Sequence, residues 1–151
     1  MRNVLEYLEQ TAVRVPCKPA FCDEARSFTF SQLLAASRAV GTAAAKQTAD
    51  RTRPIGVLVG RNAFTPLGFL SALQAGCCYV PLDPLMPAAR LNAILKQLDP
   101  ALILYGPDEA GAAEALAAVC PTLSIEAHLP DAPDDALLAA RRAAVLDTDP
   151  C

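Results

Sequence analysis

The chain has 151 residues, of which 53% are hydrophobic and 19% charged, a length and composition typical of one folded domain with a buried core. Its formal net charge is −3 and its sequence pI is near 5.1, so it has no excess of positive charge to bind phosphate backbones, which excludes nucleic acid and anionic membranes as expected partners. No apolar run reaches the roughly 18 residues of a membrane helix, and Glu6 and Glu9 lie where a signal peptide would be apolar, so we expect a cytoplasmic protein.

The first predicted elements are a helix and a hairpin. Apolar residues recur at helical spacing from Val4 to Val15, and Pro16 is expected to end this helix. Two short runs, at 19–23 and 27–30, are separated by a polar turn and predict a β-hairpin.

A capping box marks the start of the second predicted helix. The Thr29 hydroxyl is expected to accept from the backbone N–H of Gln32, whose side chain reaches back to Thr29. Phe28 and Leu33 are placed to form a hydrophobic staple across this cap. We expect the helix to run to about Gln47, where a polar stretch follows.

From residue 55 onward, short apolar runs alternate with helical segments. The run from Ile55 to Val59 is typical of a buried strand. A helix is predicted at 65–74, with Thr65 or Asn62 as its N-cap and Pro66 at its first position.

The next eighteen residues, LQAGCCYVPLDPLMPAAR, combine a helix end, a strand and a helix start. Gly76 is expected to end the helix in the left-handed conformation. Residues 77–82 then predict a short strand buried on both faces, which Asp83 and Pro84 end. Pro87 suits the first turn of the following helix.

The same alternation continues to the last residues of the chain. That helix is expected to stop at Asp99 and Pro100. A strand is predicted at 101–105, a helix at 109–120, a strand at 122–126, a loop at 128–133 and a helix at 134–145. Such alternation predicts an α/β fold with a mostly parallel sheet flanked by helices, doubly wound or part of such a fold. No linker divides the chain.

Two segments resemble the core motifs of the adenylate-forming enzymes, the superfamily of amino-acid adenylation domains and acyl-CoA ligases. The pattern LKAGxAYxPLD with a following PxxR is matched at 73–83, Pro87 and Arg90. The earlier pattern L(T/S)YxEL is matched at 28–33, with Phe in place of Tyr and Gln in place of Glu. The resemblance extends from Val4 to about Tyr105 and fades beyond it.

The resemblance implies ATP-dependent activation of a carboxylic acid. Members of the family use Mg-ATP to form an acyl-adenylate with release of pyrophosphate, and then pass the acyl group to the thiol of a phosphopantetheine carrier protein or of CoA. The YVPLDP form leans toward the aminoacyl branch, which includes D-alanine carrier-protein ligases and peptide-synthetase domains. The residues that select the acid in the family lie outside the matched segments.

A phosphate-binding loop is missing from this sequence. The family's loop is rich in Ser, Thr and Gly and ends in Lys, because clustered backbone N–H groups and an ammonium neutralise phosphate charge. Here the seven glycines are scattered, none of the three lysines directly follows a glycine, and neither GxGxxG nor GxxxxGK[ST] occurs. In the family this loop follows a stretch like 147–150. We therefore expect 1–151 to be an incomplete N-terminal subdomain of an AMP-binding domain, inactive alone, without catalytic, cofactor-binding or metal residues, and to need Mg-ATP only in a complete form.

Several residues have both a functional and a structural interpretation. Asp83, at a strand end, could contact a ligand, but we expect it to cap the helix that begins at Pro87. Arg90 could bind phosphate, but pairing with a local carboxylate or holding a loop is favoured. Tyr79 and Phe69 could line an acyl or adenine pocket, but core packing is expected.

The remaining polar and small residues carry no predicted chemistry. His128 is expected on the surface rather than as a general base. Gly56 and Gly60 flank a strand, and turn geometry accounts for them. The six cysteines are expected to be buried reduced thiols rather than disulfides or a metal site, namely Cys17, Cys22, Cys77, Cys78, Cys120 and Cys151.

Two other classes of function stay open. The chain could be a non-catalytic α/β module that binds a carrier protein or completes a split enzyme, and an exposed apolar face would then be expected. It could also be an independent nucleotide-binding protein, which would retain ATP by itself.

Overall fold

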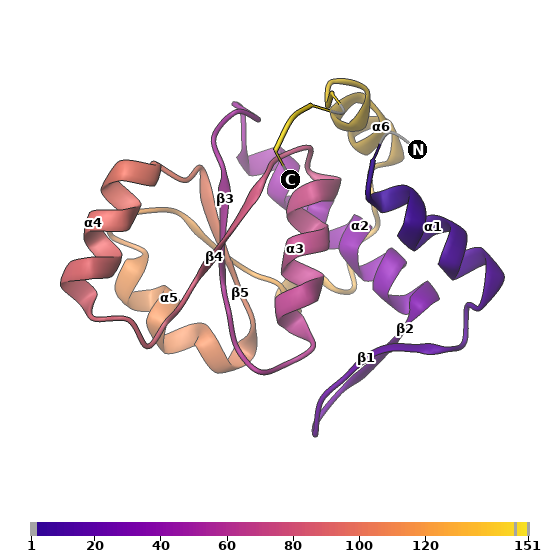
Figure 1. The fold of residues 1–151 in the computed structure, drawn as a ribbon, viewed down its shortest axis with the longest axis horizontal. Helices are drawn as coiled ribbons and strands as arrows, with labels where there is room; N and C mark the ends of the chain where they lie inside the picture. Colours follow the sequence, from indigo (N-terminus) through magenta and orange to yellow (C-terminus); the bar gives the residue numbers. More distant parts are fainter. Residues whose placement is uncertain (1–2, 147, 151) are drawn as a thin grey trace.

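A four-stranded parallel sheet forms the centre of the molecule (Figure 1). The computed structural model describes residues 3–146 and 148–150. The strand order is β4-β3-β5-β6, with β3 at Ile55–Leu58, β4 at Tyr79–Leu82, β5 at Leu102–Tyr105 and β6 at Thr122–Ser124. Because β3 and β5 lie in the middle, their residues are almost entirely buried. The expected α/β fold with a parallel sheet is confirmed.

Helices cover both faces of this sheet (Figure 1). One face carries α1 (Leu5–Arg14), α2 (Phe30–Gln47) and α3 (Phe64–Gln74), and the other carries α4 (Ala88–Leu98) and α5 (Ala110–Leu116). Successive side chains of a strand point to opposite faces. Accordingly Val57 belongs to the cluster under α2 and α3, whereas Leu58 belongs to the cluster under α4 and α5.

The N-terminal elements follow the sequence prediction closely. α1 is followed by an antiparallel hairpin of β1 (Pro19–Cys22) and β2 (Ser27–Thr29), which stands apart from the central sheet (Figure 1). Both hydrogen bonds of the capping box are present: Gln32 N–H donates to Thr29 Oγ1 at 3.3 Å, and Thr29 N–H donates to Gln32 Oε1 at 2.9 Å. Phe28 and Leu33 share one buried cluster, as a staple requires.

Gly76 ends α3 as predicted. Its φ is +75°, the left-handed conformation that favours glycine. The N–H of Cys77 donates to the carbonyl of Ala72, and the N–H of Gly76 donates to the carbonyl of Leu73. These two bonds form a Schellman motif, which satisfies carbonyl groups that the helix end would leave unpaired.

The prediction that β4 is buried on both faces was wrong. β4 is the edge strand, and of its residues Leu82 is buried whereas Tyr79 and Val80 are half-buried and Pro81 is exposed. The apolar run predicted the strand correctly, but burial depends on having a neighbour on each side, and here β3 is its single neighbour in the sheet.

Three helix starts differ from the predictions. α3 begins at Phe64, so Thr65 is not its N-cap and Pro66 is its third residue. Pro87 is the N-cap residue of α4 rather than its first helical residue. A 3₁₀ turn, η1 (Pro107–Glu109), precedes α5, which ends at Leu116 and is therefore shorter than the predicted helix at 109–120.

The C-terminal elements return to the α2 side of the molecule. β6 is followed by a second 3₁₀ turn, η2 (Glu126–His128), and by α6 (Asp135–Ala143), whose N-terminus is capped by the Asp134 side chain. Within 3–146 and 148–150, no helix combines the length and the apolar character that crossing a bilayer requires.

Candidate functional site

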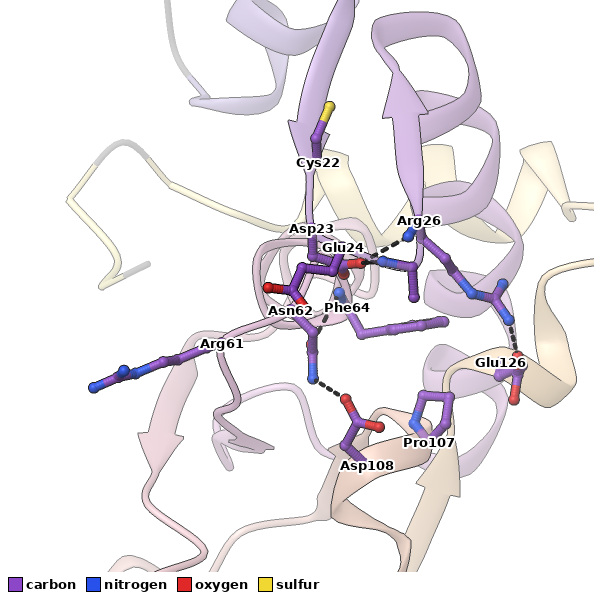
Figure 2. Close-up of a pocket in the computed structure, with 11 residues that line it drawn as sticks. Cys22, Asp23, Glu24, Arg26, Arg61, Asn62, Phe64, Pro107, Asp108 and Glu126 are labelled. Atoms are coloured by element: carbon purple, nitrogen blue, oxygen red, sulfur yellow. Dashed lines mark hydrogen bonds and ion pairs between the residues drawn. The ribbon is translucent and has the colours of Figure 1, made fainter.

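The carboxyl ends of β3 and β5 form the place where a sheet of this kind most often binds a ligand. The two strands are neighbours, but α3 leaves β3 toward one face and α5 follows β5 toward the other. Ligands of open α/β sheets bind at such switch points. A pocket of about 560 Å³ lies here and is shown in Figure 2, lined by Cys22, Asp23, Glu24, Ala25, Arg26, Arg61, Asn62, Phe64, Pro107, Asp108 and Glu126.

Asp23, in the turn of the hairpin, caps α3 from outside the helix. Its Oδ2 accepts from the backbone N–H of Ala63 at 2.7 Å, and its Oδ1 accepts from the N–H groups of Ala25 and Arg26 at 2.7 Å each. These donors, with Ala63 the strongest, hold the pKa of the Asp23 carboxyl below its ordinary value. The chain's own carboxylate thus occupies a helix N-terminus that could otherwise attract an anion.

Arg26 joins three elements at the same junction. Its guanidinium lies 4.9 Å from the centre of the Phe64 ring and forms an ion pair with Glu126 (Figure 2). The hairpin turn, α3 and η2 are therefore held together by one side chain.

Asn62 connects the loop after β3 to the loop after β5. Its Oδ1 accepts from the N–H of Phe64 at 3.1 Å, so it supports the start of α3 as the prediction allowed, although it is not the N-cap residue itself. Its Nδ2 lies 3.1 Å from Asp108 Oδ2 and 3.1 Å from Glu109 Oε1. The predicted cap Thr65 instead bonds both the N–H and the carbonyl of Gly60.

The charges at this edge oppose phosphate binding. Carboxylates outnumber the two guanidinium groups around the pocket, and Arg26 is already paired with Glu126. Arg61 extends away from the cluster in Figure 2. Like charges held within a few ångströms of a triphosphate would raise its free energy of binding. Most polar groups of the pocket bond one another, so the pocket is a junction of loops.

The two charged candidates from the sequence lie away from this junction. Asp83 is exposed, and its Oδ1 accepts from the N–H of Leu85 at 2.9 Å, which closes a turn. The predicted capping of α4 was wrong, because the cap position of that helix is Pro87 and receives no side-chain bond. Arg90 is exposed, and the predicted local ion pair is absent among the described residues.

Phe69 and Tyr79 stack on each other, with ring centroids 4.4 Å apart and an angle of 18° between the planes. Both pack against the main core, as predicted, but neither is fully buried. With residues of α1 and the hairpin, notably Tyr7 and Phe21, they line an apolar groove of about 400 Å³ on the outside of the molecule.

The other residues that the sequence singled out have structural contacts. His128 is half-buried, and its Nδ1 lies 2.7 Å from Asp131 Oδ2. Gly60 belongs to the junction described above. Gly56 lies inside β3, so turn geometry does not account for it: a Cβ there would lie 2.7 Å from Leu82 Cδ1.

The cysteines differ in how deeply they are buried. Cys77 and Cys120 are buried, and burial raises the pKa of both thiols. Cys78 is half-buried, whereas Cys17 and Cys22 are exposed, so the prediction of burial was wrong for these two. These five thiols are free, and Cys151 lies outside the described residues. Among the described residues no cluster of three Cys, His, Asp or Glu side chains suitable for a metal ion occurs.

Of the most connected residues of the junction, only Asn62 was singled out from the sequence, and only as a possible helix cap; Asp23 and Glu109 were not. Asp23 and Ala63 are 40 positions apart, and Asn62 and Glu109 are 47 apart. A partial signal was present, because Asn62 and Glu109 each follow a buried strand by a few residues, where polar side chains of neighbouring parallel strands meet.

The family of the chain follows from comparison with known proteins. A family model described as AMP-binding enzyme matches residues 8–149. The chain belongs to this family. The resemblance to adenylate-forming enzymes is therefore confirmed.

Individual relatives of this chain are much longer than it is. It is 28% identical over 141 residues to surfactin synthase subunit 2 of Bacillus subtilis, and the match covers 87% of this chain and 4% of that protein. It is 33% identical over 107 residues to nonribosomal peptide synthetase TES of Alternaria alternata, and this match covers 70% of this chain and 2% of the synthetase. The crystal structure of IdnL7 superposes with a TM-score of 0.71 at 26% identity, covering 89% of this chain and 26% of IdnL7.

Proposed function

We propose that this chain forms the N-terminal subdomain of an adenylate-forming enzyme that activates a carboxylic acid with Mg-ATP and transfers it to a carrier-protein or CoA thiol. The observation that carries the proposal is the family match over 8–149. It is supported by the segment 73–90, where the expected helix end at Gly76 and the strand β4 both occur. The free thiols support the further proposal that the enzyme acts in the cytoplasm.

An amino acid is the proposed substrate class. The support is the name of one relative, nonribosomal peptide synthetase TES, together with the YVPLDP form of the segment 79–84. Residues that would select one amino acid over another are not assigned in this chain.

We propose that the chain does not hold ATP by itself. The N–H of Ala63 at the start of α3 is bound by Asp23, and the surrounding pocket carries an excess of carboxylates. These residues do not fit a triphosphate, and we derive no chemical step from them. In this proposal the chain supplies a rigid sheet and a set of fixed loops, and the phosphate-binding loop belongs to other residues of the complete enzyme.

The test is amino-acid-dependent ATP–pyrophosphate exchange by the purified chain, with a heat-inactivated sample as control. We expect no exchange above the control, and measurable exchange would contradict the proposal of an inactive subdomain. Equilibrium dialysis with ATP tests the nucleotide-binding alternative, which micromolar affinity would support. Reading the DNA beyond residue 151 tests the split-enzyme alternative: an in-frame TSGSTG-like segment supports one continuous enzyme, whereas the same segment in a neighbouring gene supports two chains.

A further inference from the structure

Glu109 places a carboxyl group inside the loop junction. It is the last residue of η1, and 6% of its surface is exposed, although Asp108 beside it is exposed. Acidic residues are seldom buried to this extent without a paired charge. The position therefore calls for a physical explanation beyond the packing of the loop.

Two glycines leave the space that this carboxyl group fills. A Cβ at Gly60, after β3, would overlap Glu109 Oε1. A Cβ at Gly106, after β5, would lie 2.8 Å from Glu109 Oε2 and 2.9 Å from Phe64 Cβ. The ends of both central strands thus approach the carboxyl group closely: a side chain at Gly60 would displace the Glu109 carboxyl group, and one at Gly106 would also press on the Cβ of Phe64.

The hydrogen bonding of this carboxyl group is incomplete. Asn62 Nδ2 donates to Oε1 at 3.1 Å, whereas the buried Oε2 has no hydrogen-bond partner among the described residues. A neutral carboxylic acid tolerates one missing partner far better than a carboxylate does, because burying an unpaired charge costs much more than burying an unpaired hydroxyl.

The surrounding charges give the ionised form little help. Burial is the main cause that raises the pKa of Glu109, and the charge of Asp108 raises it further, while the Asn62 hydrogen bond and the nearby backbone N–H groups of Glu109 and Gly106 offset part of the rise. The other charged groups of the junction are engaged or exposed: Asp23 accepts from Ala63 N–H, Arg26 and Glu126 pair with each other, Arg61 is exposed and extends away from the cluster in Figure 2, and Glu24 is exposed.

We propose that Glu109 is a proton-controlled clasp, which holds the loops after β3 and β5 together when its carboxyl group is neutral and loosens them when it ionises. In the neutral form, Oε1 accepts from Asn62 and Oε2 carries the proton. On ionisation the second oxygen becomes an unpaired buried charge beside Asp108, and separation of the loops relieves this by admitting water. The inference concerns the junction itself and does not depend on the proposed adenylation.

The direction of the pH effect follows from proton linkage. The unfolded or opened form has the ordinary pKa of 4.5, and the closed form has a higher one. The closed form therefore binds more protons, so its stability is greatest below about pH 4.5 and falls as the pH rises through the pKa of the closed form. Across the whole pH range between the two pKa values, the equilibrium constant for opening increases in total by roughly tenfold for each unit by which the pKa of the closed form exceeds that of the opened form.

The experiment is amide hydrogen exchange at 60–64 and 106–109, measured from pH 4 to pH 8 and corrected for the intrinsic exchange rate. In the natural chain, protection of these amides is expected to fall with rising pH over that window. Glu109→Gln keeps the shape of the side chain and cannot ionise, so its protection is expected to be independent of pH across the same window.

Asp108→Asn is the matched control, since it removes the neighbouring carboxylate that binds the same Asn62. It should keep the pH dependence but move it to lower pH, because a like charge has been removed. Equal pH dependence in the natural chain and Glu109→Gln would overturn the proposal. If Glu109→Gln does not fold, an NMR titration of the Glu109 carboxyl carbon in the natural chain decides, and a midpoint at or below the ordinary value would overturn it equally.

Discussion

Gly76 and Asp23 show how single residues of this chain fix the backbone of the elements around them. Gly76 allows α3 to end in the left-handed conformation, and its α-carbon faces the backbone of α6, where a Cβ would lie 3.1 Å from the Arg141 carbonyl oxygen. Asp23 satisfies three N–H groups of two separate segments. The left-handed helix end explains the glycine at position 76, and a contact with a distant part of the chain explains the aspartate at position 23.

Replacing Gly76 tests the helix end. Gly76→Ala is expected to lower the free energy of unfolding by at least ~1 kcal/mol, because alanine is disfavoured at a φ of +75° and its methyl group would press on α6. Gly111→Ala is the control: Gly111 is an exposed residue of α5 with no atom within 4 Å of an added Cβ, so it should stabilise the protein by about 0.5–1 kcal/mol. Denaturant midpoints measure both changes in stability. Equal shifts of the midpoint in the two variants would contradict a special requirement for glycine at position 76.

Asp23 should make the stability fall in acid. Its pKa is lowered in the folded chain, so its contribution is present above its ordinary pKa of 3.8 and is lost as the pH falls through the folded value. Asp23→Ala is expected to have a lower denaturant midpoint than the natural chain at pH 7, and the difference should shrink toward pH 3. Glu24→Ala changes the adjacent exposed carboxylate and should leave the midpoint nearly unchanged at both pH values.

At the scale of elements, β4 shows why one strand of the sheet contains a proline. The N–H groups of Ile55 and Val59 in and after β3 donate to the carbonyls of Cys78 and Leu82. In a parallel ladder every second residue of the partner strand bonds in this way, so Val80 points its backbone groups toward β3, and Pro81 points toward the open edge. The missing N–H of Pro81 therefore costs no ladder bond, and the edge has fewer groups for pairing with another chain.

Moving the proline by one position tests this reading of the edge. Pro81→Val should change the free energy of unfolding by no more than about 0.5 kcal/mol, but it should increase self-association at high concentration by restoring a free edge N–H. Val80→Pro should destabilise by at least ~1 kcal/mol, because it removes a bond to β3. Similar free energies of unfolding for the two variants would contradict the assignment of the Val80 backbone groups to β3 and of Pro81 to the open edge.

The elements that the sequence predicted well are those with a local cause. The capping box at Thr29, the left-handed Gly76 and the strand starting at Ile55 all depend on residues within a few positions. The start of α3 was missed because Asp23, which binds Ala63, lies in another element. The exposure of β4 was missed for a similar reason, since an apolar run does not say whether a strand has one neighbour or two. The same limit hid the junction around Asn62 and Glu109.

At the scale of the whole molecule, the C-terminal segment binds α1, α2 and the turn after α2 through side chains 97 to 133 positions apart. Arg38 pairs with Asp135 at 2.7 Å, Arg51 with Asp149 at 3.0 Å, and Arg142 with Glu9 at 2.5 Å. These ion pairs are partly exposed, and each is expected to contribute little. Arg141 differs from them, because it donates to the carbonyls of Ala45 and Thr48 at the end of α2, the first at 2.8 Å.

The difference between Arg141 and Arg142 predicts how the two ends of the chain are coupled. Arg141→Ala leaves two helix-end carbonyls without their charged donor, so we expect a loss of about 1–3 kcal/mol in the free energy of unfolding. Arg142→Ala removes partly exposed ion pairs with Glu9 and Glu6 and should cost less than about 1 kcal/mol. Limited proteolysis should then cleave the segment 129–134 faster in Arg141→Ala, because release of α6 from α2 exposes the loop before it. Equal losses and equal cleavage rates in the two variants would mean that α6 is held by its apolar contacts, such as that of the buried Leu138, and that the charged donor at the end of α2 adds nothing.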